Sequence, residues 1–220
     1  MNTLTKYWFL EGFNLFKKLE MSTLMNMCKV LEMEHFDKGK YIPINCNKSG
    51  CVFFLKHGTV KIINGRNDTV KFIVKKGNIF GELSLYDEEA AVEEQAYALE
   101  DCIICYIPTD YMEQLMQKHQ SLKNGVLKIY GLRIKKLERR LQDLIHKDSA
   151  TRITEFISDY IQEFGSVVGD RMIAKNLLSH KDIGNLTNTS RQTVNNILSG
   201  LRKDGTIDYD SQNISMAKIA

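Results

Sequence analysis

Three features are missing from this 220-residue chain, and each absence excludes a class of protein. No run approaches the roughly 18 uninterrupted apolar residues that a helix needs to cross a bilayer. Residues 1–10 lack a basic stretch followed by an apolar run and a small-residue cleavage site, which a secretion signal would show. Composition gives no sign of disorder or of collagen, because 43% of the residues are apolar. We therefore expect a folded cytoplasmic protein that has no membrane partner.

The chain lacks a cysteine pattern typical of a disulfide framework, and its five cysteines fit reduced thiols better. The cysteines are scattered and odd in number: Cys28, Cys46, Cys51, Cys102 and Cys105. They do not converge at the close spacings of iron–sulfur ligands. Cys102 and Cys105 have CxxC spacing, but on a strand this odd spacing points the two side chains to opposite faces. The sequence therefore predicts core packing for this pair and no metal site.

Motifs of the common enzyme classes are also missing. The chain has no glycine-rich phosphate loop before a helix, no HExxH, no GxSxG and no Ser/His/Asp spacing that suggests a triad. A lone histidine is more often solvated than bound to haem, which applies to His35, His57, His119 and His146. We therefore predict that the protein is not an enzyme and holds no cofactor.

The pattern of residue types in the sequence changes near residue 40. Before it, apolar residues recur at helical steps, which predicts short helices packed on a sheet. After it, short β-branched and aromatic runs at residues 51–55, 59–63, 70–74 and 102–107 predict strands. Gly39, Gly58 and Gly77 stand 19 residues apart at corners where φ can be positive. Many short strands at this pitch predict an antiparallel barrel or jelly roll.

A heptad seam is the longest periodic signal in the chain. Residues 111–118 begin a helical stretch, and steps of three and four then connect six apolar positions: Leu127, Tyr130, Ile134, Leu137, Leu141 and Leu144. Lysine and arginine side chains, including Arg133 and Arg140, fill the exposed positions. The stripe could dock on the sheet of its own chain, but six uninterrupted seam positions favour a two-helix dimer interface.

A second domain is expected to follow a hinge. Asp148 and Ser149 form a hinge and an N-cap, and an amphipathic helix then continues to Gly165. Ser179 to Asp182 have the form of a capping box, so another helix should start there. It would break at Thr187-Asn188 and restart at Thr189 or Ser190, which is the arrangement of a helix-turn-helix.

The outward face of the second of these helices has the chemistry of base recognition. Its exposed residues are Ser190, Arg191, Gln192, Asn195 and Asn196. Arginine can bond guanine in bidentate fashion, glutamine and asparagine can do the same to adenine, and serine hydroxyls suit phosphate. An ordinary helical hairpin with a polar face would look similar. Strand-like runs at residues 206–209 and 213–216 follow, however, and predict a wing.

Charge does not by itself explain binding by this segment. Residues 148–220 carry eight Lys and Arg against nine Asp and Glu, whereas residues 118–147 carry nine against two. The formal net charge of the whole chain is only +3. Any attraction of the helix-turn-helix for DNA must therefore come from the local placement of a few cations.

At this point the chain resembles the CRP–FNR family of transcription regulators over nearly its whole length. Residues 182–198 resemble the family's helix-turn-helix, in which S-R-(E or Q)-T-V opens the recognition helix. Residues 58–61, Gly81-Glu82-Leu83, residues 98–102 and Ile107-Pro108 resemble its β-roll sensor. The heptad helix resembles its dimerisation helix. Asn188 replaces a common glycine in the turn, and asparagine tolerates the left-handed conformation.

The resemblance implies roles for individual residues. Arg191, Gln192, Asn195 and Asn196 would read bases, whereas phosphates would be bound by Ser179, His180, Lys181, Thr189 and Ser190. Gln192 stands where many members have Glu, and Asn196 where the best-known members have a second Arg, so the operator should differ from theirs.

The expected effector pocket is degenerate. Members that bind cyclic AMP clamp its phosphate with an Arg-Ser or Arg-Thr pair, and the glutamate of Gly-Glu-Leu takes a ribose hydroxyl. Gly81, Glu82 and Leu83 are present here, but Val92 and Glu93 align with the clamp, and the sequence has no arginine between Arg66 and Arg133. A phosphate beside Glu93 and Glu94 with no cation would be repelled. Cyclic AMP binding is therefore not expected, and the effector is unknown.

Together these patterns predict an α+β protein with three parts. Residues 1–116 would form an antiparallel β-roll sensor domain, residues 117–147 a dimerisation helix, and residues 148–220 a winged helix-turn-helix. The expected partners are a second copy of the chain and double-stranded DNA with a pseudo-palindromic operator, and RNA polymerase is a possible further partner. The alternative function is a ligand-binding regulatory module that does not bind DNA.

Overall fold

The computed structural model describes residues 3–44, 50–81 and 94–218. The chain divides into two compact units, Met1–Lys136 and Leu137–Ala220, which we describe in turn. Within the described residues, no helix is both long enough and apolar enough to cross a membrane. The predicted boundaries after residues 116 and 147 stay predictions.

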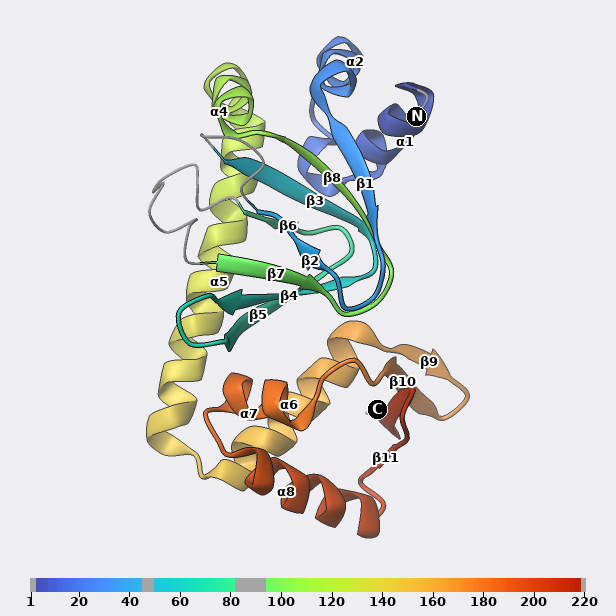
Figure 1. Ribbon diagram of the computed structural model, residues 1–220, viewed down its shortest axis with the longest axis vertical. Coiled ribbons are helices and arrows are strands. Elements are labelled where there is room, and N and C mark those ends of the chain that lie inside the picture. Colours follow the sequence, from blue (N-terminus) through green and yellow to red (C-terminus); the bar gives the residue numbers. More distant parts are fainter. Residues whose placement is uncertain (1–2, 45–49, 82–93, 219–220) are drawn as a thin grey trace. The chain divides into compact units, whose positions relative to one another are not determined.

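The first unit contains two four-stranded antiparallel sheets. Their strand orders are β1-β8-β3-β6 and β2-β7-β4-β5 (Figure 1). The strands are β1 (Glu32–Phe36), β2 (Tyr41–Ile42), β3 (Cys51–His57), β4 (Thr59–Asn64), β5 (Thr69–Lys75), β6 (Ile79–Phe80), β7 (Glu94–Ala98) and β8 (Cys102–Pro108). The predicted runs of β-branched residues therefore form β3, β4, β5 and β8. β1 was not predicted, because residues 32–36 were included in the expected helical region.

Glycine corners connect several of these strands. Gly39, Gly58 and Gly77 have φ values of 81°, 91° and 82°, which confirms the positive φ expected for them. Gly58 also cannot carry a side chain, since a Cβ there would lie 2.6 Å from the carbonyl oxygen of Asp101. The 19-residue spacing of these glycines thus corresponds to corners of the β-roll.

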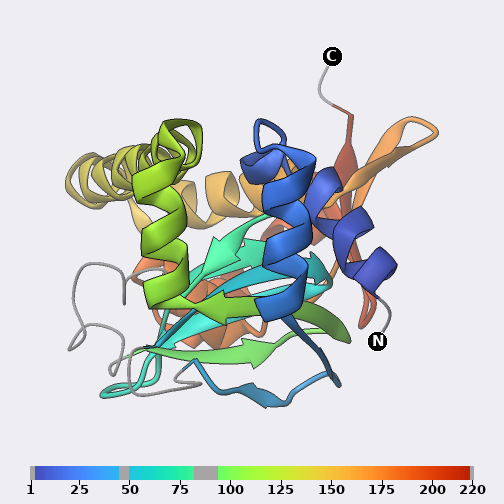
Figure 2. The same cartoon turned by 90° about the horizontal axis from the view of Figure 1, so that it is seen from above.

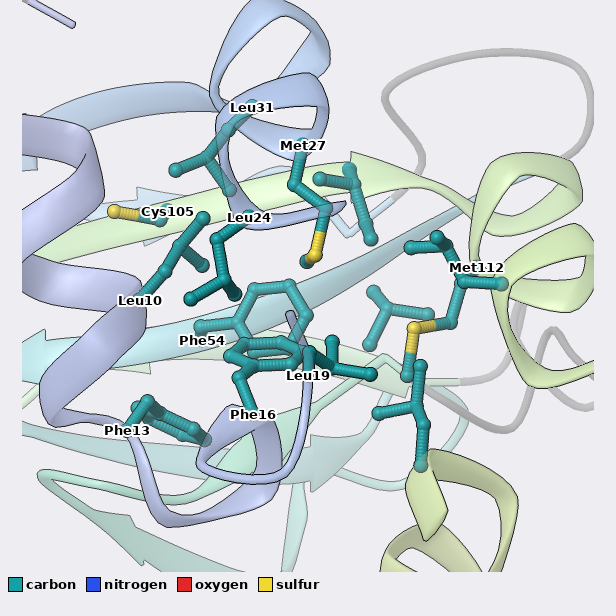
Figure 3. Close-up of a cluster of buried hydrophobic side chains, with 14 of the residues drawn as sticks. Leu10, Phe13, Phe16, Leu19, Leu24, Met27, Leu31, Phe54, Cys105 and Met112 are labelled. Carbon is teal, nitrogen blue, oxygen red and sulfur yellow. The ribbon is translucent and has the colours of Figure 1, made fainter. Parts of the chain in front are cut away.

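Short helices cover the outer face of the sheet that contains β3 and β8 (Figures 1 and 2). They are α1 (Thr3–Gly12), the 3₁₀ turn η1 (Asn14–Phe16), α2 (Met21–Val30) and α4 (Thr109–Lys118). Their apolar side chains pack with Phe54 and Cys105 in one core (Figure 3). A second core lies between the two sheets and includes Phe53 and Cys102. Adjacent residues of β3 therefore enter different cores, as the two-residue period of a strand requires.

The cysteines divide in the same way. Cys102 and Cys105 belong to different cores, which confirms that they point to opposite faces. Cys28, Cys102 and Cys105 are free and buried. Cys51 is disulfide-bonded, so the expectation of reduced thiols throughout was wrong for this residue. Cys46 lies outside the described residues.

The long helix α5 (Gln120–His146) begins in the first core, where Leu122 and Val126 are fully buried. Farther along, large apolar side chains are 41–61% exposed within a single chain: Leu127, Ile134, Leu137, Leu141 and Leu144. Tyr130 differs from these other seam residues, because it is partly buried against the sensor core. The apolar stripe is therefore mostly uncovered by its own chain.

Two arginines of α5 are not solvated as the heptad pattern suggested. Arg133 donates a hydrogen bond of 2.7 Å to the carbonyl oxygen of Ile79, and its guanidinium lies 4.7 Å from the ring centre of Phe72. Burial lowers the pKa of Arg133 to about 10. Arg140 donates to the carbonyl oxygen of Leu186 at 2.7 Å. The expectation that both side chains point into solvent was wrong, because a guanidinium can bond a backbone carbonyl that leaves no mark in the sequence.

The second unit combines three helices with a four-stranded antiparallel sheet of order β11-β12-β10-β9. Its elements are α6 (Ser149–Phe164), β9 (Ser166–Val168), β10 (Arg171–Lys175), α7 (His180–Thr187), α8 (Arg191–Lys203), β11 (Ile207–Tyr209) and β12 (Asn213–Ala217). Asp148 caps α6 by accepting a 2.7 Å hydrogen bond from the backbone of Thr151. The helices, the turn and the wing lie where the sequence predicted them. The β9–β10 hairpin was not predicted.

Candidate nucleic-acid interface

A capping box starts α7. The Ser179 hydroxyl accepts a hydrogen bond of 3.1 Å from the backbone of Asp182, and the Asp182 carboxylate accepts one of 3.0 Å from the backbone of Ser179. The hydroxyl of Ser179 also donates to this carboxylate at 2.7 Å. The predicted helix start is therefore confirmed, with aspartate in the place of the usual glutamate or glutamine.

The turn between α7 and α8 depends on two small or adaptable residues. Asn188 has φ 52° and ψ 54°, which confirms the left-handed conformation expected of it. A Cβ on Gly184 would lie 2.8 Å from the carbonyl oxygen of Thr189, so only glycine allows this close packing. The backbone of Thr189 in turn donates 2.8 Å to the carbonyl oxygen of Gly184. Close backbone contacts therefore contribute to the path of the chain from α7 into α8.

One side of helix α8 is polar and exposed, and the other side is apolar and buried. Ser190 caps its start by accepting a 3.0 Å hydrogen bond from the backbone of Thr193. Val194 and Leu198 are buried. The exposed residues on the other side of the first two turns are Arg191, Gln192, Asn195 and Asn196. Three of these four, together with His180, line a surface hollow.

Two of the exposed side chains are ordered by each other. The Gln192 amide donates a hydrogen bond of 3.1 Å to the Asn196 side-chain oxygen, one helical turn away. The paired amides still offer further donors and acceptors, because each amide can take part in several hydrogen bonds. The two side chains therefore keep hydrogen-bonding groups available on the exposed face of α8.

The residues predicted to bind phosphate lie at the starts of α7 and α8, but their hydroxyls already have partners. The Ser179 hydroxyl proton is donated to Asp182, the Ser190 hydroxyl lies 2.9 Å from that of Thr193, and the Thr189 hydroxyl lies 2.9 Å from that of Thr187. Lys181 is exposed and His180 is half-buried at the first turn of α7. A phosphate role for all five residues stays a prediction.

The wing is a short hairpin of β11 and β12 closed by Asp210. The Asp210 carboxylate accepts hydrogen bonds of 2.7 Å from the backbones of Gln212 and Asn213, and these donors lower its pKa below the ordinary 3.8. The side chain of Asn176 ties this turn to the segment after β10 by donating 2.7 Å to the Asp210 carbonyl oxygen. The wing is thus held beside the helix-turn-helix.

Comparison with protein families decides what this architecture is. Residues 33–119 match the model of the cyclic nucleotide-binding domain, and residues 151–219 match that of the Crp-like helix-turn-helix domain. The chain belongs to the CRP–FNR family. It is accordingly a transcription regulator with a helix-turn-helix DNA-binding domain, and the predicted α+β architecture is confirmed.

Individual CRP–FNR proteins resemble it along most of their length. The global nitrogen regulator of Synechococcus elongatus is 26% identical over 191 residues, which cover 84% of this chain and 86% of the relative. The CRP-like cAMP-activated global transcriptional regulator of Mycobacterium tuberculosis is 22% identical over 204 residues, covering 91% and 90%. These relatives are transcription regulators rather than enzymes, in agreement with the missing catalytic motifs.

Two solved structures share the fold of this chain. A mutant of CooA from Carboxydothermus hydrogenoformans superposes with a TM-score of 0.71 at 20% identity, covering 96% of this chain and 91% of that protein. FixK2 from Bradyrhizobium japonicum gives a TM-score of 0.71 at 16% identity, covering 86% and 93%.

The CRP–FNR effector pocket can be described only in part. Glu82, Leu83, Val92 and Glu93 lie outside the described residues. Gly81 is buried with φ 73°, and a Cβ there would lie 2.7 Å from the carbonyl oxygen of Cys51, so packing alone requires this glycine.

Glu94, the first residue of β7, has a cationic partner that its sequence neighbours do not reveal. Glu94 is 4% exposed, and its carboxylate pairs with the Lys71 ammonium at 2.5 Å. From the sequence, Glu94 was expected to stand near the pocket without a cation. That expectation was wrong for Glu94, because its cation Lys71 lies 23 positions away on β5.

Sequence reasoning missed two contributors to the interface. Gly184 had a usable signal, since a glycine inside a predicted helix often marks close packing. Arg152 bonds the turn through backbone carbonyls and had no such signal.

Proposed function

We propose that this regulator binds a pseudo-palindromic operator as a homodimer, with α8 of each copy in the major groove. Arg191, Gln192, Asn195 and Asn196 would read base edges. Lys181 and His180, with Ser179, Thr189 and Ser190, would hold phosphates through their side chains or the helix N-terminal amides. The observation that carries this proposal is the exposure of four base-reading side chains on the first two turns of α8.

The homodimer is supported by the apolar stripe on α5. Five large apolar side chains at seam positions are between 41% and 61% exposed in the single chain, and regularly spaced exposed apolar residues on a helix are typical of a helical interface. In a two-fold dimer, recognition helices about 34 Å apart would meet consecutive major grooves. A dimer also explains why the operator should be pseudo-palindromic.

We infer that cyclic AMP is not the effector. The sequence offers Val92 and Glu93 where the phosphate clamp of cyclic AMP-binding members has Arg followed by Ser or Thr. Burying a phosphate without that cation would cost several kcal/mol. Calorimetric titration with cyclic AMP should therefore give no heat of binding, and low-micromolar affinity would contradict this part of the proposal.

The remaining assignments are parts of the same proposal. Residues 1–116 would act as the sensor, residues 117–147 as the dimerisation helix and residues 148–220 as the DNA-binding domain. The protein would act in the cytoplasm, where DNA and RNA polymerase are its macromolecular partners.

Selection from a random-sequence duplex library tests the function. The wild-type protein should enrich one inverted repeat, and its binding to random duplex should weaken steeply with salt, by about 0.9 in log-log slope for each neutralised phosphate. No enrichment together with a flat salt response would favour the alternative, a ligand-binding module that does not bind DNA.

A further inference from the structure

Three successive carbonyl groups end α7 just before the recognition helix. They belong to Leu186, Thr187 and Asn188, and α7 ends at Thr187. The last four carbonyls of an α-helix have no partner within the helix, and they carry the negative end of its dipole. Their orientation sets the start of α8, because only Thr189 and Ser190 separate them from Arg191. A cation that binds them can therefore position the base-reading residues.

Two arginines bind these carbonyls from two different helices. Arg140 on α5 donates from Nη2 to the Leu186 oxygen at 2.7 Å. Arg152 on α6 donates from Nε to the Thr187 oxygen at 3.0 Å and from Nη2 to the Asn188 oxygen at 3.4 Å. Hydrogen bonds from a charged donor are stronger than neutral ones. All three carbonyls thus face guanidinium groups rather than solvent alone.

Arg152 also reaches the end of α5. Its Nη1 donates 2.6 Å to the carbonyl oxygen of Lys147, directly after the last residue of that helix. The Lys147 ammonium bridges Asp143 at 2.6 Å and Glu155 at 2.5 Å, one on each side of the break between α5 and α6. The sequence suggested a hinge at Asp148. Hydrogen bonds and ion pairs nevertheless connect residues that precede Asp148 with residues that follow it.

We propose that Arg140 and Arg152 are positioning residues that fix α8 relative to the last turns of α5. Residues 137–147 then move with the helix-turn-helix as one body, which agrees with the compact unit that begins at Leu137. This inference rests on the proposed function, since positioning matters only if α8 reads DNA. If α5 forms the dimer seam, Arg140 connects that seam directly to the recognition turn.

The two arginines differ in what could replace them. The hydrogen bond that Arg140 donates to the Leu186 oxygen is one that a lysine ammonium could also make. Arg152 bonds three carbonyls at the ends of α5 and α7 with three different nitrogens, and a lysine cannot reproduce that planar fork. We therefore expect Arg140→Lys to retain function and Arg152→Lys to lose it.

The test compares dissociation constants on three DNAs: the duplex selected by the wild-type protein, a duplex with one half of that sequence, and a random duplex. Arg140→Gln should weaken binding to the full site roughly tenfold, the expected effect of one charge-assisted hydrogen bond, and leave the half-site and random duplexes unchanged. Arg152→Gln should weaken the full site and the half-site but not the random duplex. Arg140→Lys should bind the full site like wild type.

Arg139→Gln is the matched control. It removes the same charge from the neighbouring position of α5, where Arg139 lies in an exposed ion pair of 3.4 Å with Asp159. Binding of Arg140→Gln indistinguishable from that of Arg139→Gln would overturn the positioning role. An equal loss on all three DNAs with a smaller salt slope would also overturn it, because that result identifies a direct phosphate contact.

Hydrogen exchange in the free protein separates this inference from the proposed function. Peptides that cover residues 184–190 should exchange faster in Arg140→Gln and in Arg152→Gln than in Arg139→Gln. Unchanged exchange would refute the contacts themselves. If selection enriches no DNA, the proposed function fails, and the exchange measurement still decides whether the two arginines hold the turn.

Discussion

Replacing Leu137 with alanine should weaken the proposed dimer by a predictable amount. Leu137 is 61% exposed in the single chain, and full burial of a leucine side chain stabilises by about 1.5–3 kcal/mol. Covering the exposed part in a dimer therefore contributes about 1 kcal/mol per copy. Because a two-fold interface contains the residue twice, Leu137→Ala should cost about 2 kcal/mol, which raises the dimer dissociation constant about thirtyfold.

Leu132 offers a matched control for this substitution. It is 59% exposed, on the same helix, but lies two residues before Ile134 and so on a different face. Sedimentation equilibrium over a series of protein concentrations should show weaker association for Leu137→Ala and unchanged association for Leu132→Ala. Equal behaviour of the two variants would refute the assignment of the seam.

Three further predictions concern stability and reactivity. Burial raises the pKa of Cys102 to about 11 and of Cys105 to about 12, so iodoacetamide should label neither thiol until the protein unfolds; peptide mass mapping that finds native labelling would contradict this. Because the pKa of Asp210 is lowered in the folded state, its ionised carboxylate stabilises the fold above pH 3.8. This stabilisation is lost as the pH falls through the lower pKa of the folded state. The wild-type protein should therefore have a higher melting temperature than Asp210→Asn at neutral pH. This difference in melting temperature should vanish in acid. Arg133→Ala should destabilise the first unit by about 2–3 kcal/mol in urea unfolding, since it loses the charged bond to Ile79; a change under about 0.5 kcal/mol would show that the bond is unimportant.

Local sequence signals explain why the structure of the helix-turn-helix within residues 148–220 was predictable. The capping box at Ser179, the left-handed Asn188 and the cap at Ser190 each depend on residues within a few positions of one another. The apolar period of α8 is likewise complete within the helix. Sequence therefore sufficed to place the turn and the outward residues.

Structure was needed where partners are distant or carry no side-chain signal. Arg133 and Arg140 bond backbone carbonyls that lie 54 and 46 positions away, and every residue has a carbonyl. The β9–β10 hairpin was missed although Gly169, with φ 63°, stands at its turn beside two valines. β1 was missed because its residues are mostly polar and exposed, so no apolar alternation marks it as a strand.

Base reading by α8 is the central claim, and the Arg191→Ala variant tests it most directly. Its affinity should be measured on the selected duplex, on duplexes with each base pair changed, and on random DNA, beside Lys181→Ala. The account predicts that Arg191→Ala loses about 1–3 kcal/mol on the selected duplex and no longer discriminates at one base pair, whereas Lys181→Ala weakens all sequences alike. An equal loss on selected and random DNA for Arg191→Ala would contradict the account.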